Sequence, residues 1–241
     1  MGIIADTHCH TIVSGHAYSS LLEMVLSAAK QNLWAIAITD HGRSTPNSPG
    51  PWYFENLSTG VPNIVEKVRV LKGIEANVWD YDGNLDASNM LLSSLDWVVS
   101  SMHPETLQVV DDIDACTNAW LNVAKNPYVN VIGHSGDHRY KYDYEKVIPE
   151  FGKNGKLVEI NNGSFKVRKR SIENCIKIAI VCRDYKVPVI LNSDAHFSTQ
   201  VGDVGLAEKL LKEINFPEEL IVNSNLERFK KYLSEYTSFL F

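Results

Sequence analysis

The stretch WAIAITDH, residues 34–41, shows in eight residues the pattern that decides the fold of this chain. Its first part is apolar throughout rather than alternating, which is typical of a strand that is covered on both faces. Its end carries His41, and imidazole groups are ligands of divalent metals. A buried strand that ends in such groups predicts a parallel sheet with a site at its carboxyl edge.

The same pattern recurs along the chain, because seven of the eight histidines lie at or just after the end of an apolar run. His16 follows the first run in a turn. A lone histidine at a strand end is usually an ordinary hydrogen-bonded group, but this repetition predicts a site that binds more than one metal ion. The other runs are GIIADTHCH (2–10, His8 and His10), VRVLKGIE (68–75, Glu75), LDWVVSSMH (95–103, His103), VNVIGH (129–134, His134) and VPVILNSDAH (187–196, Asp194 and His196).

Strand-like and helix-like segments alternate. Such an order predicts parallel strands joined by right-handed crossovers. Residues 43–63 interrupt this alternation of strands and helices. Here we expect a loop over the site, with a short helix near 52–57. The predicted strands are 2–7, 35–40, 69–76, 96–102, 129–133, 156–161 and 187–192, and the predicted helices are 19–31, 111–125, 144–153, 171–185, 205–213 and 226–236.

An open sheet and a closed barrel both fit this α/β order, and the candidate ligands decide between them. Seven strands in an open sheet would spread their ends over roughly 25–30 Å at the usual spacing of about 4.8 Å. A barrel brings all the ends to one mouth, where barrel enzymes keep their active sites. We therefore expect a single barrel domain over residues 1–241.

Composition narrows the classes of function. The 241 residues carry a net charge of −6, which disfavours a nucleic-acid or anionic membrane partner. No run of about 20 apolar residues could span a bilayer, and the start of the chain does not resemble a signal peptide. The four cysteines form no C-x-x-C pair and suit buried thiols. These features predict a cytoplasmic protein.

The ligand types indicate the metal and its chemistry. His8 and His10 are two apart on a strand and share a face, so both can bind one ion. Imidazole and carboxylate together suit zinc, manganese or iron(II). Seven histidines, Glu75 and Asp194 exceed the needs of one tetrahedral ion, and they fit two or three ions with a bridging carboxylate.

Eight short segments resemble the PHP superfamily, named after polymerase and histidinol phosphatase, and in particular its small YcdX-type stand-alone phosphatases. They occur in order along nearly the whole chain, which makes the resemblance specific although each piece is weak. The resemblance implies a distorted (β/α)7 barrel with a trinuclear site at its mouth. The segments are DTHCHT, SGHAYSS, ITDHG, GIEANV, SMHPE, GHSGD, EINNGSF and NSDAH.

By this resemblance the nine ligands fall into three sets, and three divalent ions are expected, zinc first and manganese or iron as alternatives. The relatives also imply a homo-oligomer, a trimer. His8, His10 and Asp194 would hold the first ion; Glu75 would bridge it to the second, completed by His103 and His134; His16, His41 and His196 would hold the third.

Three divalent ions and two carboxylates leave a formal charge of about +4, which favours an anionic substrate. We therefore expect hydrolysis of a small phosphate monoester by a metal-activated water. Glu75 and Asp194 serve the metals, and Asp194 or a bound water is a candidate proton donor to the leaving oxygen. Arg43, just after His41, is the first candidate for a phosphate contact.

Further side chains are candidates for supporting roles. Asp6 and Asp40 could each accept the second N–H of a ligand imidazole. The other candidates are His138, on the substrate side; Asn161, Asn162 and Ser164, toward substrate or ligands; Lys166, Arg168 and Arg170, toward phosphate; and Trp52, Tyr53 and Phe54, over the site.

Rival functions remain at this stage. Amidohydrolases also begin with H-x-H on a barrel strand, but they bridge their metals with a carboxylated lysine, whereas the middle strand here offers Glu75 and has Lys72 away from its tip. Histidinol phosphate is a candidate substrate. An exonuclease is disfavoured because the chain has no basic stripe. A metal-stabilised interaction domain is disfavoured because no ligand position is missing.

Overall fold

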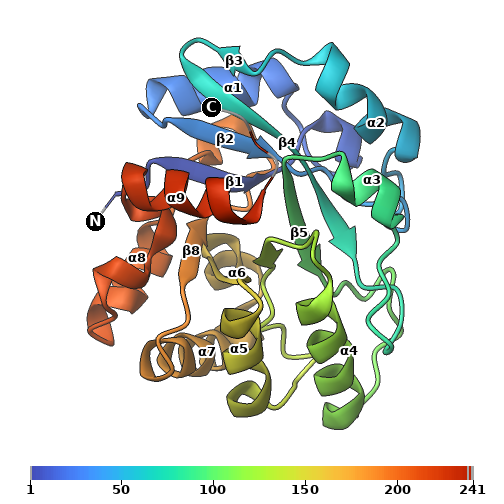
Figure 1. Cartoon of the computed structure of the whole chain (residues 1–241), viewed down its shortest axis with the longest axis vertical. Helices are drawn as coiled ribbons and strands as arrows, with labels where there is room; N and C mark the ends of the chain where they lie inside the picture. Colours follow the sequence, from blue (N-terminus) through green and yellow to red (C-terminus); the bar gives the residue numbers. More distant parts are fainter. Residues whose placement is uncertain (1, 238, 240–241) are drawn as a thin grey trace.

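The computed structural model describes residues 2–237 and residue 239. Within them, seven parallel strands form a nearly closed barrel surrounded by helices, so the predicted barrel is confirmed (Figure 1). The strands follow one another around the barrel in chain order. They are β1 (Ala5–Cys9), β2 (Ala35–Ile38), β4 (Val68–Asn77), β5 (Trp97–Ser101), β6 (Val131–Ile132), β7 (Leu157–Asn161) and β8 (Val189–Asn192).

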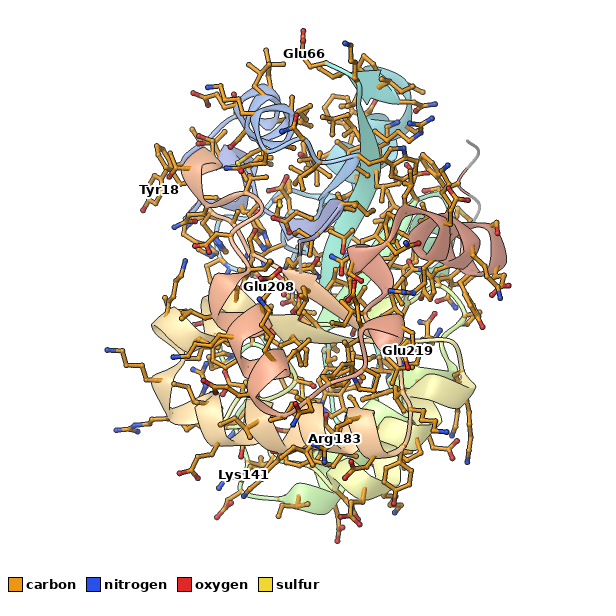
Figure 2. The ribbon with its side chains drawn as sticks, turned by 90° about the vertical axis from the view of Figure 1, so that its left-hand side faces the viewer. Tyr18, Glu66, Lys141, Arg183, Glu208 and Glu219 are labelled. Carbon is orange, nitrogen blue, oxygen red and sulfur yellow. The ribbon has the colours of Figure 1, made fainter. Side chains whose placement is uncertain are left out.

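Helices occur at the six predicted places. Ser20 caps the first with a reciprocal bond to Glu23, and Asp112 and Asp143 cap two others. Charged side chains such as Lys141 project from the surface in Figure 2. Among the described residues, no helix has the length and apolar content to cross a bilayer. The helices are α1 (Leu21–Lys30), α4 (Ile113–Lys125), α5 (Tyr144–Lys153), α7 (Ile172–Asp184), α8 (Gly205–Glu213) and α9 (Leu226–Tyr236).

Some elements differ from the prediction, mostly because short elements leave little periodicity. The expected short helix in residues 43–63 is α2 (Pro51–Gly60), which packs Phe54 and Leu57 into the core. The elements that were not predicted are β3 (Ile64–Val65), antiparallel to β4, α3 (Asn89–Ser93), α6 (Asn162–Val167) and the 3-10 turns Ile12–Ser14, Lys169–Ser171, Ser198–Gln200, Glu218–Leu220 and Val222–Ser224.

The barrel interior is apolar at one end and polar at the other. At the amino ends of the strands, Leu71 and Trp97 pack against Phe229 of α9, with the rings of Trp97 and Phe229 5.9 Å apart between centroids. Strand residues two apart share a face, so Glu75 lies on the same face as Leu71 but nearer the carboxyl end. Helix α9 thus closes one end of the barrel and leaves the other end for a site.

The seam between β1 and β8 is closed mainly by side chains. Asn223 is fully buried there, and its side-chain amide donates to the carbonyls of Ala5 (2.8 Å) and Leu191 (2.6 Å). Its Oδ1 accepts the N–H of Leu191 at 3.1 Å, and its backbone carbonyl accepts that of Ile4 at 2.9 Å. One asparagine therefore replaces ladder bonds that these two strands do not make.

We expect Asn223→Ala to destabilise the barrel by about 3 kcal/mol, because three buried backbone groups lose their partners. At 241 residues this corresponds to a fall in Tm of roughly 6–12 °C. Thermal unfolding followed by circular dichroism measures it. Asn118→Ala, on the exposed face of α4, is the control and should change Tm little. Equal Tm values for the two variants would contradict this role of Asn223.

Candidate metal centre

The carboxylate of Glu75 lies at the centre of a cluster of imidazoles at the barrel mouth. Glu75 is fully buried near the carboxyl end of β4. Five histidines from four other strand ends face its two oxygens, so one side chain connects the whole cluster. The nearest distances to its oxygens are 2.7 Å from His41 Nδ1, 3.0 Å from His134 Nε2, 3.3 Å from His8 Nε2, 3.4 Å from His103 Nε2 and 3.5 Å from His10 Nε2.

The remaining predicted ligands lie in the same cluster. Asp194 Oδ1 is 3.2 Å from His10 Nε2 and 3.7 Å from His8 Nε2. On the open side, His16 Nε2 is 3.3 Å from His41 Nε2 and 3.0 Å from His196 Nε2. All nine side chains expected from the sequence are therefore brought together.

The spacing within the cluster matches that of metal ligands. Two nitrogen ligands that each lie about 2.0–2.1 Å from a tetrahedral ion are about 3.3 Å apart. The Nε2 atoms of His103 and His134 are 3.2 Å apart and face each other. Lone pairs at this distance repel unless a cation or a proton lies between them, so the arrangement suits bound ions.

The opposite ring nitrogens of several histidines are held by acceptors, as in metal sites where the second N–H fixes the imidazole. His8 Nδ1 donates to Glu159 at 2.7 Å, and His103 Nδ1 donates to the side-chain oxygen of Asn77 at 2.7 Å. Backbone carbonyls accept from the Nδ1 atoms of His16 (3.1 Å) and His196 (2.9 Å). These bonds leave the Nε2 atoms directed inward.

Several inward atoms are buried without a hydrogen-bond partner among the described residues. They include His8 Nε2, both ring nitrogens of His10, His41 Nδ1 and Glu75 Oε2. Buried polar groups are normally paired, so unpaired ones that face each other call for a ligand. Three sets of ligand atoms lie within 4.8 Å of one another: His8, His10 and Asp194; His41, Glu75 and His103; and His10, His41 and His196.

Glu159 on β7 is a site residue that was not predicted, because none of the nine candidate ligands lies on that strand. Besides His8 Nδ1 it accepts the backbone N–H of His134 at 2.7 Å and the side-chain amides of Asn192 (2.9 Å) and Asn161 (3.1 Å). Its signal was a glutamate inside the buried apolar run LVEIN, residues 157–161. It holds two ligand segments in place.

The charges inside the cluster shift one another. Burial alone would raise the pKa of Glu75, but His8, His103 and His41 outweigh it and hold the pKa well below its ordinary value. Burial and neighbouring imidazoles lower the pKa of His10. Asp194 likewise has its pKa held well below the ordinary value, against burial, by His8 first. An ionised Asp194 suits a metal ligand better than the proton donor considered above.

Two ligand residues adopt left-handed backbone conformations. The φ angle is 24° at His134 and 58° at Asp194. Such angles are uncommon for residues other than glycine and concentrate at functional sites. Each lies two residues after the end of its strand, β6 or β8, at the barrel mouth.

A cavity of about 390 Å³ opens beside the cluster. Through this cavity a molecule from solvent can reach the part of the cluster where His16 is exposed. Two arginines line it: Arg168, whose Nη1 is 3.3 Å from Asp194 Oδ2, and Arg139. Its full lining is His16, His41, Thr45, Pro46, Asn47, His103, Pro104, Glu105, Arg139, Arg168, Asp194 and His196.

Arg43 does not line this cavity, and its side chain is exposed. The backbone after His41 turns away toward Asp86, which accepts the N–H of Ser44 at 2.9 Å. The sequence shows that Arg43 lies two positions after the ligand His41, but it does not show in which direction the arginine side chain points. The cation beside the cluster is instead Arg168, from the segment after α6.

The aspartates before the ligands do not orient imidazoles, which corrects the expectation for both. Asp6 accepts from the Ser193 hydroxyl and from the N–H of Gly202 (2.8 Å). Asp40 accepts from Thr11 (2.7 Å), Ser14 (2.6 Å) and Tyr53 (2.7 Å). Both are buried and tie loops together, so they position the ligands only through the backbone.

Other candidates also lie away from the ligands. Asn162 caps the start of α8 through the N–H groups of Leu206 and Ala207. His138 contacts Ser171 rather than the cavity, with 3.4 Å between His138 Nδ1 and Ser171 Oγ. Trp52 is 76% exposed. All four cysteines of the chain are free thiols.

Comparison with known proteins places this architecture. The family model of the PHP domain matches residues 6–163. The chain belongs to the PHP domain family. This family match and the barrel confirm the resemblance seen in the sequence.

Two PHP relatives are similar over nearly their whole length. A "Probable phosphatase" from Caldanaerobacter subterraneus subsp. tengcongensis is 42% identical, with 97% of this chain and 92% of the relative covered. A second "Probable phosphatase", from Thermoanaerobacter sp., is 43% identical, with 98% of this chain and 96% of the relative covered. A crystal structure of histidinol phosphate phosphatase from Lactococcus lactis, in complex with zinc, L-histidinol and phosphate, has a TM-score of 0.62. At 18% identity, covering 88% of this chain and 94% of that one, it shows the shared fold.

Proposed function

We propose that this protein is a metal-dependent phosphatase that hydrolyses small phosphate monoesters. The observation that supports it most is the set of inward-facing imidazole and carboxylate atoms at metal-ligand spacing, with a cavity and Arg168 beside them. A cluster of divalent ions and an arginine together suit a phosphate dianion. The names of the two close relatives point the same way.

The proposed metals are three divalent ions, zinc first. Imidazole and carboxylate donors suit zinc, and the Lactococcus protein of the same fold was crystallised with it. Manganese and iron(II) accept the same donors. The proposed ligand sets are His8, His10 and Asp194; Glu75 as the bridge, with His103 and His134; and His16, His41 and His196.

When bound, the ions would supply positive charge and an activated water for attack on phosphorus. The side chains of the protein would bind the phosphate and hold the ligands in position. Arg168, whose Nη1 donates to Asp194 Oδ2 at 3.3 Å and which lines the cavity, would donate to the phosphate oxygens. Glu159 and Asn77 fix the imidazoles that must not rotate. Asp194 stays ionised as a ligand, so the leaving oxygen takes its proton from solvent in the open cavity.

The direct test is phosphate release with and without metal. We expect protein treated with a chelator to be inactive on p-nitrophenyl phosphate and on a panel of phosphorylated metabolites. Zinc, manganese or iron(II) should restore activity. Elemental analysis should give about three ions per chain at saturation, the number of ligand sets proposed above. Full activity in metal-free protein would refute the proposal.

Two alternatives have specific tests. Histidinol phosphate hydrolysis is favoured by the Lactococcus structure, and histidinol phosphate belongs in the panel. Amidohydrolase chemistry is disfavoured, because the Lys72 side chain bonds to Asn63 and does not join the cluster. Amide and lactone substrates tested beside the phosphate esters separate these classes.

We expect Arg168→Ala to raise the inhibition constant of inorganic phosphate by about 10- to 100-fold. This factor corresponds to the loss of one hydrogen bond between charged groups. Metal content should change less than phosphate binding does. Arg43→Ala is the matched control, since its side chain lies outside the cavity. Unchanged phosphate inhibition in the Arg168 variant would remove this residue from the site.

Metal binding is expected to release protons and to weaken as the pH falls. Burial lowers the pKa of His8, but the carboxylates of Glu159 and Glu75 outweigh burial and hold it well above its ordinary value. This imidazole must lose a proton to bind an ion, so affinity falls about tenfold per proton for each pH unit. Titration calorimetry in buffers of different ionisation enthalpy counts the protons. Equal heats in all buffers would contradict the expectation.

A further inference from the structure

The cavity holds a second arginine that the phosphatase proposal does not use. Arg139 follows the ligand His134 by five residues, in the loop after β6, and its side chain is 35% exposed. It lines the cavity together with Pro104 and Glu105, which follow the ligand His103. Arg168, at the end of α6, lies next to Asp194. The two cations therefore reach the cavity from different loops.

Arg139 is held in a fixed orientation. Its Nε donates to Asp137 Oδ1 at 3.0 Å and its Nη2 donates to Asp137 Oδ2 at 2.7 Å. The Asp137 side chain is only 4% exposed, and it also accepts the backbone N–H of Arg139 at 3.0 Å. A buried carboxylate with both oxygens engaged prevents the guanidinium from turning, which lowers the entropy cost of binding a further group.

This pairing uses one edge of the guanidinium and leaves the other available. An arginine has five N–H donors, and the bond to Asp137 occupies Nε and one hydrogen of Nη2. Among the described residues, no acceptor takes a hydrogen bond from Nη1. The end formed by Nη1 and Nη2 matches the two oxygens of a second carboxylate.

We propose that Arg139 selects substrates whose leaving group carries a carboxylate. This rests on the proposed phosphatase function and deepens it. Arg168 and the ions would take the phosphate, and Arg139 would pair with the carboxylate. The cavity of about 390 Å³ fits a small phosphorylated acid. Glu105 in the same cavity is the opposing feature, since it would favour a cationic leaving group and its charge helps to raise the pKa of Arg139. It is exposed, however, and no ion pair within 4 Å joins it to another described residue.

The test compares three substrates in the zinc-loaded protein. 3-Phosphoglycerate and glycerol 1-phosphate differ only in a carboxylate against a hydroxymethyl group, and histidinol phosphate has a cationic leaving group. We expect kcat/KM to be about tenfold or more higher for 3-phosphoglycerate than for glycerol phosphate. Arg139→Gln should abolish this preference and bring the ratio down to about one, a loss of about tenfold or more. Arg139→Lys, which keeps the charge but loses the planar fork, should lie between.

A matched series separates specificity from folding. Arg43→Gln lies outside the cavity and should leave the ratio unchanged. Asp137→Asn should raise KM for 3-phosphoglycerate more than it lowers kcat, because it loosens Arg139 without removing it. Tm and metal content identify any variant that simply misfolds.

The outcomes distinguish the two proposals. A preference for histidinol phosphate that Glu105→Gln abolishes, or a ratio that Arg139→Gln does not change, would overturn the role of Arg139. Metal-dependent release of phosphate from glycerol phosphate would still support the phosphatase. Release from none of the three substrates, nor from p-nitrophenyl phosphate, would overturn the phosphatase proposal and the inference that rests on it.

Discussion

Replacement of Glu75 by glutamine is expected to abolish activity and to remove at least one metal ion per chain. The amide is nearly the same size, but it has no negative charge and can offer only one oxygen. Five imidazoles lie within 3.5 Å of this carboxylate, so a change here affects every part of the cluster. A metal ion contributes several kcal/mol to a charged transition state. The loss in kcat/KM should therefore reach about 10³-fold or more.

Elemental analysis and phosphate-release kinetics on the same preparation check this expectation. Glu219→Gln, on the surface in Figure 2, is the matched control and should retain full metal and full turnover. Circular dichroism identifies misfolding. Normal metal content with normal turnover in the Glu75 variant would show that this carboxylate does not bridge ions.

The second large effect is expected at Glu159. This carboxylate accepts four hydrogen bonds, two of them from His8 and from the backbone of His134. The side-chain amide of glutamine carries an NH2 group, which cannot accept the hydrogen bonds that one carboxylate oxygen accepts now. One donor, such as His8 Nδ1, would then lose its acceptor. Loss of such a partner typically lowers metal affinity by about 10- to 100-fold. Stability should also fall by about 1–3 kcal/mol, because buried donors lose their acceptor.

The Glu159 variant differs from the Glu75 variant in kind. At saturating zinc it should recover its full complement of ions, because no ligand has been removed. Competition with a chromophoric chelator measures the affinity, and Glu173→Gln, exposed in the first turn of α7, is the control. If ions are lost even at saturation, Glu159 is itself a ligand. If affinity is unchanged, its role is only structural.

Most of the architecture could be predicted from the sequence. Helices α5 and α9 have their predicted bounds, because their apolar periodicity is clear and Asp143 and Asn225 cap their first turns. Short elements were less predictable, since tertiary contacts rather than local sequence stabilise them. The strand predicted at 129–133 pairs over only two residues, as β6, and the two-residue strand β3 was not predicted. The expected trimer stays a prediction.

The ligands were predictable because their type and their place at strand ends follow from local sequence. The residues that hydrogen-bond to the ligands could not be predicted in this way. Glu159 lies inside an apolar strand, and Asn77 reaches His103 across 26 positions of sequence. The choice of Arg168 over Arg43 depended on the direction in which each loop turns, and nothing local fixes that direction.

Periodicity and residue type are local properties, so two features follow from the sequence alone: the alternation of strands with helices, and an imidazole or carboxylate group at the ends of six of the seven strands. Which of these groups face each other, at what distance, and which cations line the cavity depend on the three-dimensional fold. Barrel closure sets those distances, and it depends on contacts such as those of Asn223 between the first and last strands. The bond from Asn223 to Ala5 joins residues 218 positions apart, and a one-dimensional pattern does not encode such a pairing.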